Sequence, residues 1–461
     1  MIAQKIEQYD APHQFEPLMP AAGVLGPLLE RASDLSRAAT ALGTASGKTA
    51  QVELRALLRS MNSYYSNRIE GEHTRPSDIE RALQQDFSAN SGLARKQRLA
   101  VAHIRSEQLC EAEIDSRLTA SGTLGAQADT AARWLYSCEA LTWLHGELFC
   151  DLPASDLMLS DGNLLVPGQM RQRAVAVGRH EPAGPPQGRI PECAARRFSS
   201  AAPTAASLPG FLARWAKVYG QTRRGEAAIV ALAASHHRLA WMHPFPDGNG
   251  RVARLHTHLL LHAWGLTNGL WSPLRGFARS EARYKALLAA ADEPRRGDLD
   301  RRGNLSQAGL TAWIGYTLDV CIDQVTFMAQ QLDINGMRGR IEAALAFEVS
   351  AMKSGARPEA LMPLHYLFAT QTELGRAEFK TLTGLGDRVA TDTLSALLRR
   401  GFLATDSSYG KLRFAVPRHA LRFYFPALWP EAELDEALLQ AEQGAGAAPA
   451  GGLAIQRRPQ R

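Results

Sequence analysis

The sequence has few cysteines for its length, and they follow no metal-binding or disulfide pattern. Its 461 residues contain five cysteines, with no CxxC and no close pair. An odd, unpatterned count argues against a disulfide framework and for a reducing compartment. Long hydrophobic runs are also missing, because the N-terminal segment lacks the apolar stretch of a signal peptide and histidines interrupt the longest apolar stretches. These absences predict a cytoplasmic protein that does not cross a membrane.

The excess of positive over negative charge is also small. The net charge is +6, from 52 Lys and Arg against 46 Asp and Glu, and the pI is near 9.1. This weak basic balance is compatible with binding to polyphosphate or DNA but is diagnostic of neither. Hydrophobic residues make up 45% of the chain, as in soluble globular proteins. The length exceeds that of one ordinary core, so we expect two or three domains.

Strand signals are scarce, and apolar residues recur at helical spacing over most of the chain, which predicts an all-α fold. A capping box from Ser77 to Glu80 predicts the start of one helix. Before residue 400 the only clear strand signal lies between Arg173 and Gly178, and its turn-rich flank predicts a β-hairpin flap over a helical body. The other predicted helices cover roughly residues 21–43, 47–68, 94–114, 127–150, 207–219, 225–242, 249–264, 307–330 and 336–352.

The pattern changes at about residue 358. Helices predicted over 361–369, 376–383 and 388–400 precede a hairpin over 401–416, which is the order of a winged helix-turn-helix. The end of the chain is rich in Ala, Gly and Pro, and this composition predicts disorder. We therefore expect four parts: an N-terminal helical region (1–115), a helical core (116–355), a winged-helix domain (356–430) and a disordered tail (431–461).

The most informative stretch is HPFPDGNGRVAR, from residue 243 to residue 254. Gly248 and Gly250 flank Asn249 directly before a helical run. Glycines at a helix start let several main-chain N–H groups converge, and the helix dipole adds partial positive charge there. The arrangement predicts an anion-binding nest, typically for phosphate.

Four side chains of the same stretch suit phosphoryl-type transfer. Arg251 and Arg254 are three residues apart, so they share one face of the first helical turn and can reach successive phosphates. Asp247 is a hard oxygen ligand beside the nest and suits Mg²⁺ that bridges phosphate oxygens. His243 has a pKa range suited to a general base.

This stretch resembles the Fic motif, HPFx(D/E)GNGRxxR, at every specified position, and the resemblance extends over roughly residues 55–330. It implies an enzyme, a protein adenylyltransferase that moves AMP from ATP to a Ser, Thr or Tyr hydroxyl of a target protein or of itself. It also implies that His243 deprotonates the hydroxyl and that Asp247 holds Mg²⁺. The residues implied to bind the phosphates of ATP are Gly248, Asn249, Gly250, Arg251 and Arg254.

A second resemblance lies upstream, where the segment from Ser66 to Gly71 (SNRIEG) fits the family's inhibitory pattern, (S/T)xxxE(G/N). The resemblance implies that Glu70 pairs with Arg254 and displaces the γ-phosphate. A carboxylate and a phosphate would then compete for one bidentate donor. The alternative is that Glu70 and Gly71 merely end a helix.

Two further resemblances concern the nucleotide site. Val177 and Gly178 resemble part of the hairpin that covers the nucleotide and aligns the target segment by main-chain hydrogen bonds. The alternative is an ordinary surface hairpin. Tyr284 stands where family members place a tyrosine near the base and the nucleotide, and a core aromatic residue is the alternative there.

Other interpretations stay open from the sequence. His256, His258 and His262 could suggest a metal site, but no carboxylate accompanies them in the sequence. Residues 356–420 carry nine Lys or Arg and six Asp or Glu, so a DNA-binding regulator in which the Fic core is secondary is an alternative function. A Fic enzyme that removes AMP or uses another nucleotide is a further alternative. The candidate partners are a target protein, DNA and a second copy of the chain.

Overall fold

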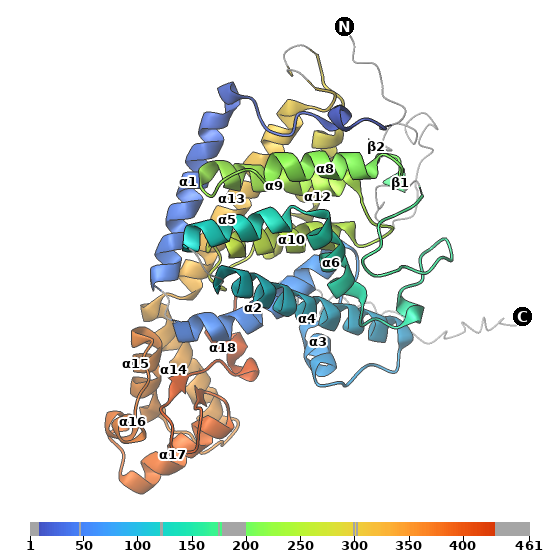
Figure 1. Ribbon diagram of the computed structural model, residues 1–461. Helices are drawn as coiled ribbons and strands as arrows, with labels where there is room; N and C mark the ends of the chain where they lie inside the picture. The colour runs from blue at the N-terminus through green and yellow to red at the C-terminus, as the bar shows by residue number, and fades with distance from the viewer. Residues whose placement is uncertain are drawn as a thin grey trace, which may run out of the picture.

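The structure is a computed structural model that describes residues 9–45, 48–119, 123–173, 176–177, 200–297, 300 and 303–428. Gly178 and the tail (431–461) lie outside the described residues. Helices dominate, and the strands of the described part form only two two-stranded pairs. The prediction of an all-α fold with a small hairpin is therefore confirmed (Figure 1).

Two helices form the centre of the larger body, α9 (Glu226–Met242) and α10 (Asn249–Ala263). Nearly all residues of both are buried, as expected of helices that are covered on every side. Helices α1, α8 and α13 pack against α9, while α4, α5 and α6 pack against α10. The other helices of this body are α1 (Ala22–Ala45), α2 (Lys48–Ile69), α3 (Pro76–Leu83), α4 (Ser91–Thr119), α5 (Leu124–Leu135), α6 (Cys138–Phe149), α8 (Leu208–Tyr219), α11 (Leu274–Arg279), α12 (Glu281–Asp292) and α13 (Gln307–Gln331).

Three helix predictions need correction. The helix predicted over 127–150 is two helices, because Ser137 caps α6 by accepting a hydrogen bond from the N–H of Ala140 at 3.0 Å. The capping box predicted at Ser77 is wrong: α3 begins at Pro76, and its N-cap Arg75 makes no side-chain cap bond. Proline at the first helical position already fixes a helical φ, so the helix starts one residue earlier. Helices α11 and α12 were not predicted.

The predicted flap is present only in part among the described residues. Strand β1 (Ala176–Val177) pairs antiparallel with β2 (Ser200–Ala201), and Val177 lies opposite Ser200. The partner strand is made of small residues without β propensity, so its sequence carried no strand signal.

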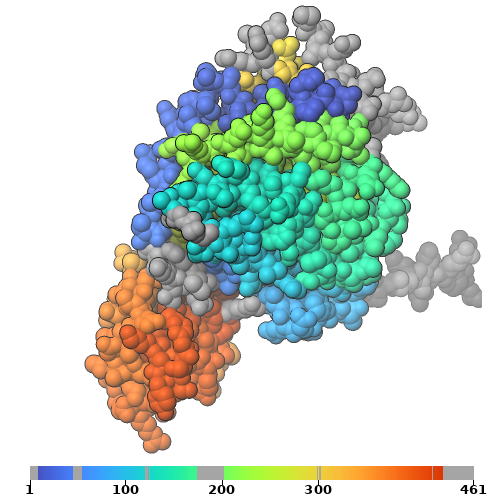
Figure 2. Space-filling model, in the orientation of Figure 1, coloured from blue at the N-terminus to red at the C-terminus, as the bar shows by residue number. Residues whose placement is uncertain are grey.

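The C-terminal elements form a lobe beside the larger body in the space-filling view (Figure 2). Helix α14 (Ile334–Ser350) opens this lobe and packs against its later helices. These later elements are α15 (Leu361–Thr370), α16 (Arg376–Thr383), α17 (Asp387–Arg399), the antiparallel pair β3 (Leu403–Ala404) and β4 (Arg413–Phe414), and α18 (Leu421–Tyr424). Their order is the one expected for residues 356–430, and a DNA-binding role for them stays a prediction.

The lobe contacts α2, because the hydroxyl of Tyr65 donates to the carbonyl of Leu428 at 2.9 Å. Both residues are fully buried. None of the described helices is long and apolar enough to cross a membrane. The four described cysteines, Cys110, Cys138, Cys150 and Cys321, are free thiols.

Candidate active site

His243 ends α9 in a left-handed conformation, with φ 49° and ψ 60°. For a residue other than glycine this costs on the order of 1–3 kcal/mol, so the surroundings must hold it there. Its Nδ1 lies 3.0 Å from the carbonyl oxygen of Ala240, which can only accept, so Nδ1 carries the proton and Nε2 keeps its lone pair. Burial and, to a smaller extent, the charge of Arg171 lower the pKa of His243. The imidazole is therefore neutral at neutral pH and able to accept a proton.

The glycines of the loop have a structural reason to be there. Gly248 begins α10 as its N-cap with φ 78°, and a Cβ at this position would lie 2.5 Å from the ring of Phe149. Asn249 is buried, and its amide accepts from the N–H of Phe245 at 2.9 Å and donates to the carbonyl of Phe245 at 2.8 Å. The side chain of Asn249 thus closes the loop, and only its main-chain N–H is left to face an anion.

Asp247 stands at the outer side of this loop with 51% of its side chain exposed, and Arg251 donates to its Oδ2 at 3.1 Å. His145 of α6 bonds to the main chain of the same residue. Its Nδ1 accepts the N–H of Gly168 at 2.8 Å, so its Nε2 carries the proton and donates to the carbonyl of Asp247 at 3.3 Å. Burial lowers the pKa of His145 to about 4, which keeps the ring neutral.

Arg254 is almost completely buried, with 1% of its side chain exposed, and it contacts the end of α2. Its Nε donates to the hydroxyl of Ser66 at 3.0 Å, and its Nη2 donates to the carbonyl of Ser66 at 3.0 Å and to Oε1 of Glu70 at 2.5 Å. Carbonyls in the last turn of a helix lack helical partners and lie at the negative end of its dipole, so a guanidinium suits this position. Gly71, with φ 81°, follows the end of the helix, so the Glu70–Arg254 pair and the helix end occur together, and inhibition by Glu70 stays a prediction.

The carboxylate of Glu70 also lies directly against the predicted nest. A Cβ added to Gly250 would overlap with Oε1 of Glu70. Burial alone would raise the pKa of Glu70, but the charges of Arg254 and Arg251 outweigh burial and hold this pKa below its ordinary value. An ionised carboxylate therefore lies where the main-chain N–H groups and arginines of α10 would receive an anion.

Tyr284 belongs to a buried chain of hydrogen bonds that begins at Arg254. Nδ1 of His236 donates to the hydroxyl of Thr257 at 2.7 Å, because this hydroxyl itself donates to the carbonyl of Ala253 at 2.9 Å. Nε2 of His236 must then accept from the hydroxyl of Tyr284 at 3.0 Å, and this hydroxyl in turn accepts from Arg254. Tyr284 thus orients the guanidinium and does not contact His243 in these bonds.

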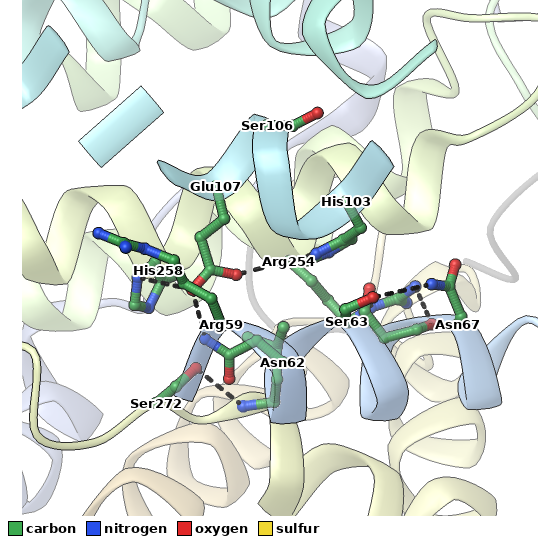
Figure 3. A network of polar contacts seen from close by, with 12 residues as sticks. Arg59, Asn62, Ser63, Asn67, His103, Ser106, Glu107, Arg254, His258 and Ser272 are labelled. Carbon is green, nitrogen blue, oxygen red and sulfur yellow. Dashed lines mark hydrogen bonds and ion pairs between the residues drawn. The ribbon is translucent and has the colours of Figure 1, made fainter. Parts of the chain in front are cut away.

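A buried polar network fixes α2 against α4 and α10 (Figure 3). Asn62 donates to Oε1 of Glu107 at 2.7 Å, Arg59 donates to Oε2 of Glu111 at 2.9 and 2.6 Å, and His258 donates to Oε1 of Glu111 at 2.9 Å. Burial, followed by the charge of Glu111, raises the pKa of Glu107 well above its ordinary value and so favours its neutral form. Figure 3 shows Asn62, Glu107 and His258 of this network beside the helices that carry Ser66 and the motif.

The three histidines of α10 have separate partners. His256 bonds to a main-chain carbonyl at the end of α5, whereas Nε2 of His258 and of His262 meets Glu111 and Asp115 of α4 at 2.9 and 2.8 Å. The carboxylates that the sequence lacks nearby are therefore supplied by another helix. Among the described residues, Glu107, Glu111 and His258 bring three ligand atoms within 4.8 Å of one another. Because Arg59 and Asn62 already occupy carboxylate oxygens of this buried cluster, the half-exposed Asp247 is the better candidate to hold a metal ion.

The two predicted flap residues can be placed only partly. Val177 lies in β1, and only its main chain is described. Gly178 is outside the described residues. Sequence reasoning missed His145 and Arg171, which contact the motif loop from α6 and from the segment before β1, and neither lies in a recognisable pattern.

The comparisons with known proteins agree with this geometry. Residues 135–261 match the model of the Fic/DOC family, and this span includes the whole loop from residue 243 to residue 254. No curated protein matches the chain at a significant level.

Several solved structures are similar at low identity. A Fic family protein from Desulfovibrio desulfuricans G20 is 16% identical over 87% of this chain and 98% of that chain, with a TM-score of 0.48. A Fic domain containing signaling protein from Bacteroides thetaiotaomicron VPI-5482 is 15% identical over 65% and 95%, with a TM-score of 0.43. Fic-1 from C. elegans is 14% identical over 67% and 73%, with a TM-score of 0.42. The family match, and not these distant likenesses, leads to the conclusion that the chain contains a Fic/DOC family domain within residues 135–261.

Proposed function

We propose that the chain transfers AMP from ATP to a Ser, Thr or Tyr hydroxyl of a target protein or of itself, and that Glu70 inhibits this transfer. The observation that carries the proposal is the double contact of the Glu70 carboxylate, with Arg254 at 2.5 Å and with the face of Gly250. An anion bound at these groups competes with a phosphate for the same donors.

The transfer itself is a single displacement at phosphorus. The hydroxyl oxygen forms a bond to the α-phosphorus of ATP, the bond from this phosphorus to the bridging oxygen of pyrophosphate breaks, and the hydroxyl proton passes to Nε2 of His243. The tautomer of His243 supports this role, because its Nδ1 proton is engaged with Ala240 and its pKa is lowered by burial. The rest of the catalysis is positioning and charge neutralisation by the nest, Arg251 and Arg254.

Asp247 suits Mg²⁺, because its carboxylate is half exposed beside the nest and has a free side toward solvent for a metal that keeps several waters. Bound there with the phosphates, the ion would neutralise charge that develops on them. Arg251 donates to the same carboxylate, and this arginine would turn to a phosphate when nucleotide binds.

The test is mass spectrometry of the purified full chain after incubation with Mg²⁺ and, in separate samples, ATP, GTP, CTP or UTP. We expect an added AMP on the Glu70→Gly variant with ATP, and none on Glu70→Gly/His243→Ala. An adduct from another nucleotide would replace AMP as the transferred group. No adduct with any nucleotide, on the chain or on proteins of a cell extract, would overturn the proposed transfer.

A further inference from the structure

We propose that Arg171 is a positioning residue that fixes the main chain of His243 and ties it to both strands of the flap sheet, at the end where β1 begins and β2 ends. The proposal rests on the proposed role of His243 as the base. It concerns a residue outside the motif, on the segment that leads from α6 into β1.

The contacts of Arg171 with the motif loop come from both its side chain and its main chain. Its Nε donates to the carbonyl of His243 at 2.6 Å, and its Nη2 donates to the carbonyl of Met242 at 3.3 Å. Its own N–H donates to the carbonyl of Pro244 at 2.9 Å. Three successive carbonyls at and just beyond the end of α9 thus accept hydrogen bonds from one residue, where a helix end leaves carbonyls without helical partners.

The same guanidinium reaches the flap. Its Nη1 donates at 3.1 Å to the carbonyl of Arg173, three residues before β1. Its Nη2 donates at 2.5 Å to the carbonyl of Pro203, just after β2. Arg171 is 4% exposed, so these bonds are made away from water, where they constrain geometry most. Any displacement of the flap sheet is therefore transmitted to the main chain that orients the imidazole.

The charge of Arg171 has a second consequence for His243. Among the described residues, all four side-chain hydrogen bonds of Arg171 go to carbonyl oxygens, so its positive charge has no carboxylate in direct contact there. After burial, this charge is what lowers the pKa of His243, while the charges of Glu70 and Asp247 raise it. Removing the charge should therefore raise the pKa of His243 and move the acid limb of the rate profile to higher pH.

The experiment uses Arg171→Gln and Arg171→Lys in the full-length Glu70→Gly protein, with Arg238→Lys as the matched control. Arg238 is also a fully buried arginine that donates to main-chain carbonyls, but its partners are Pro17, Ala291 and the ring of His237, outside the motif loop. For Arg171→Gln we expect kcat to fall about 10- to 100-fold, because small misplacements of a catalytic group have effects of this size, with KM for ATP within about twofold.

The two variants separate the two contributions. Arg171→Gln should shift the acid limb of kcat upward in pH. Arg171→Lys should keep the limb and still lose kcat, since one ammonium group cannot reach both the loop and the two flap strands. Arg238→Lys should lower the melting temperature without changing kcat or the position of the acid limb. A kcat equal to that of the Glu70→Gly parent, together with an unmoved acid limb, in both Arg171 variants would overturn the proposal.

A readout that needs no turnover distinguishes this proposal from the proposed function. The His243 imidazole, identified by the NMR signal that His243→Ala lacks, is titrated in the nucleotide-free protein, once with Arg171 intact and once in the Arg171→Gln variant. A higher titration pH and faster amide exchange at Met242, His243 and Phe245 in the variant support the role of Arg171 even if no nucleotide is transferred. An unchanged titration with unchanged exchange contradicts it even if transfer is confirmed.

Discussion

Replacing Glu70 by glycine should activate the enzyme, and the contacts of Arg254 determine by how much. The change removes the carboxylate that lies 2.5 Å from Nη2 of Arg254. The guanidinium stays aimed at the site, because both of its bonds to Ser66 are kept. Glu70 follows the last residue of α2, so the added glycine does not interrupt a helix. The variant should therefore fold normally and offer Arg254 to a phosphate.

The magnitude follows from the energy of one charge-assisted hydrogen bond. Such bonds contribute about 1.5–3 kcal/mol net when their partners are largely shielded from water. The side chain of Arg254 is 1% exposed and that of Glu70 is 29% exposed, so this range applies. Since about 1.4 kcal/mol corresponds to a factor of ten, the productive orientation of ATP should become about 10- to 150-fold more populated. The rate of labelling should rise by the same factor, with little change in ATP affinity.

The assay is the initial rate of self-labelling with labelled ATP. Glu72→Gly is the matched control, because it removes a carboxylate two residues further on that pairs with Arg95 at the same distance, 2.5 Å. Glu72→Gly should leave labelling at the wild-type level, and Glu70→Gly/His243→Ala should show no labelling. A flat rate in Glu70→Gly with a normal melting curve, or an equal rise in Glu72→Gly, would refute the reasoning.

Three further predictions concern the base, acid stability and the C-terminal lobe. His243→Ala in the Glu70→Gly protein should lower labelling by about 10²–10⁴-fold and leave the ATP Kd from calorimetry nearly unchanged; labelling near the parent rate would exclude His243 as the base. Burial lowers the pKa of His103 to about 3. Between about pH 6.5 and pH 3 the unfolded chain therefore binds a proton at His103 that the folded chain does not, so the free energy of unfolding decreases as the pH is lowered. Urea unfolding of His103→Gln should therefore lose about 2 kcal/mol less than wild type between pH 7 and pH 5, and equal losses would contradict this. If the lobe binds DNA, the full chain should shift duplex DNA at low salt, and Arg388→Ala should reduce the salt dependence by about one phosphate contact; no shift would favour protein docking or dimerisation.

The sequence predicted best what lies within one stretch of chain. The loop from residue 243 to residue 254 was identifiable because its glycines, arginines and carboxylate are contiguous. Helices were found where the apolar pattern is regular. The predicted helix over 127–150 was wrong because the apolar pattern continues through Ser137, and only the cap bond to Ala140 shows that one helix stops and another starts. Strand β2 was missed because two small residues carry no periodicity.

Contacts between distant elements could not be predicted in this way. Arg171 and His145 reach the motif loop from segments that are 72 and 102 residues away from their partners in the chain. Nothing in their local sequence distinguishes them from surface arginines and core histidines. The side chain of Asn249 was expected near phosphate, yet it closes the loop on Phe245, because a buried amide must satisfy its own hydrogen bonds first.

Helix α2 is attached to the rest of the molecule on two sides, and this bears on how inhibition can be relieved. Asn62 and Arg59 bind it to the buried carboxylates of α4, and Tyr65 binds it to the C-terminal segment through Leu428. Breaking the first set would leave charges buried without partners, which is far costlier than turning one side chain. We therefore expect release of Arg254 to occur by rotation of Glu70 beyond the end of the helix, with α2 itself in place. We expect a ligand of the C-terminal lobe to favour or disfavour this rotation of Glu70 through Tyr65, which bonds to Leu428 and precedes Ser66.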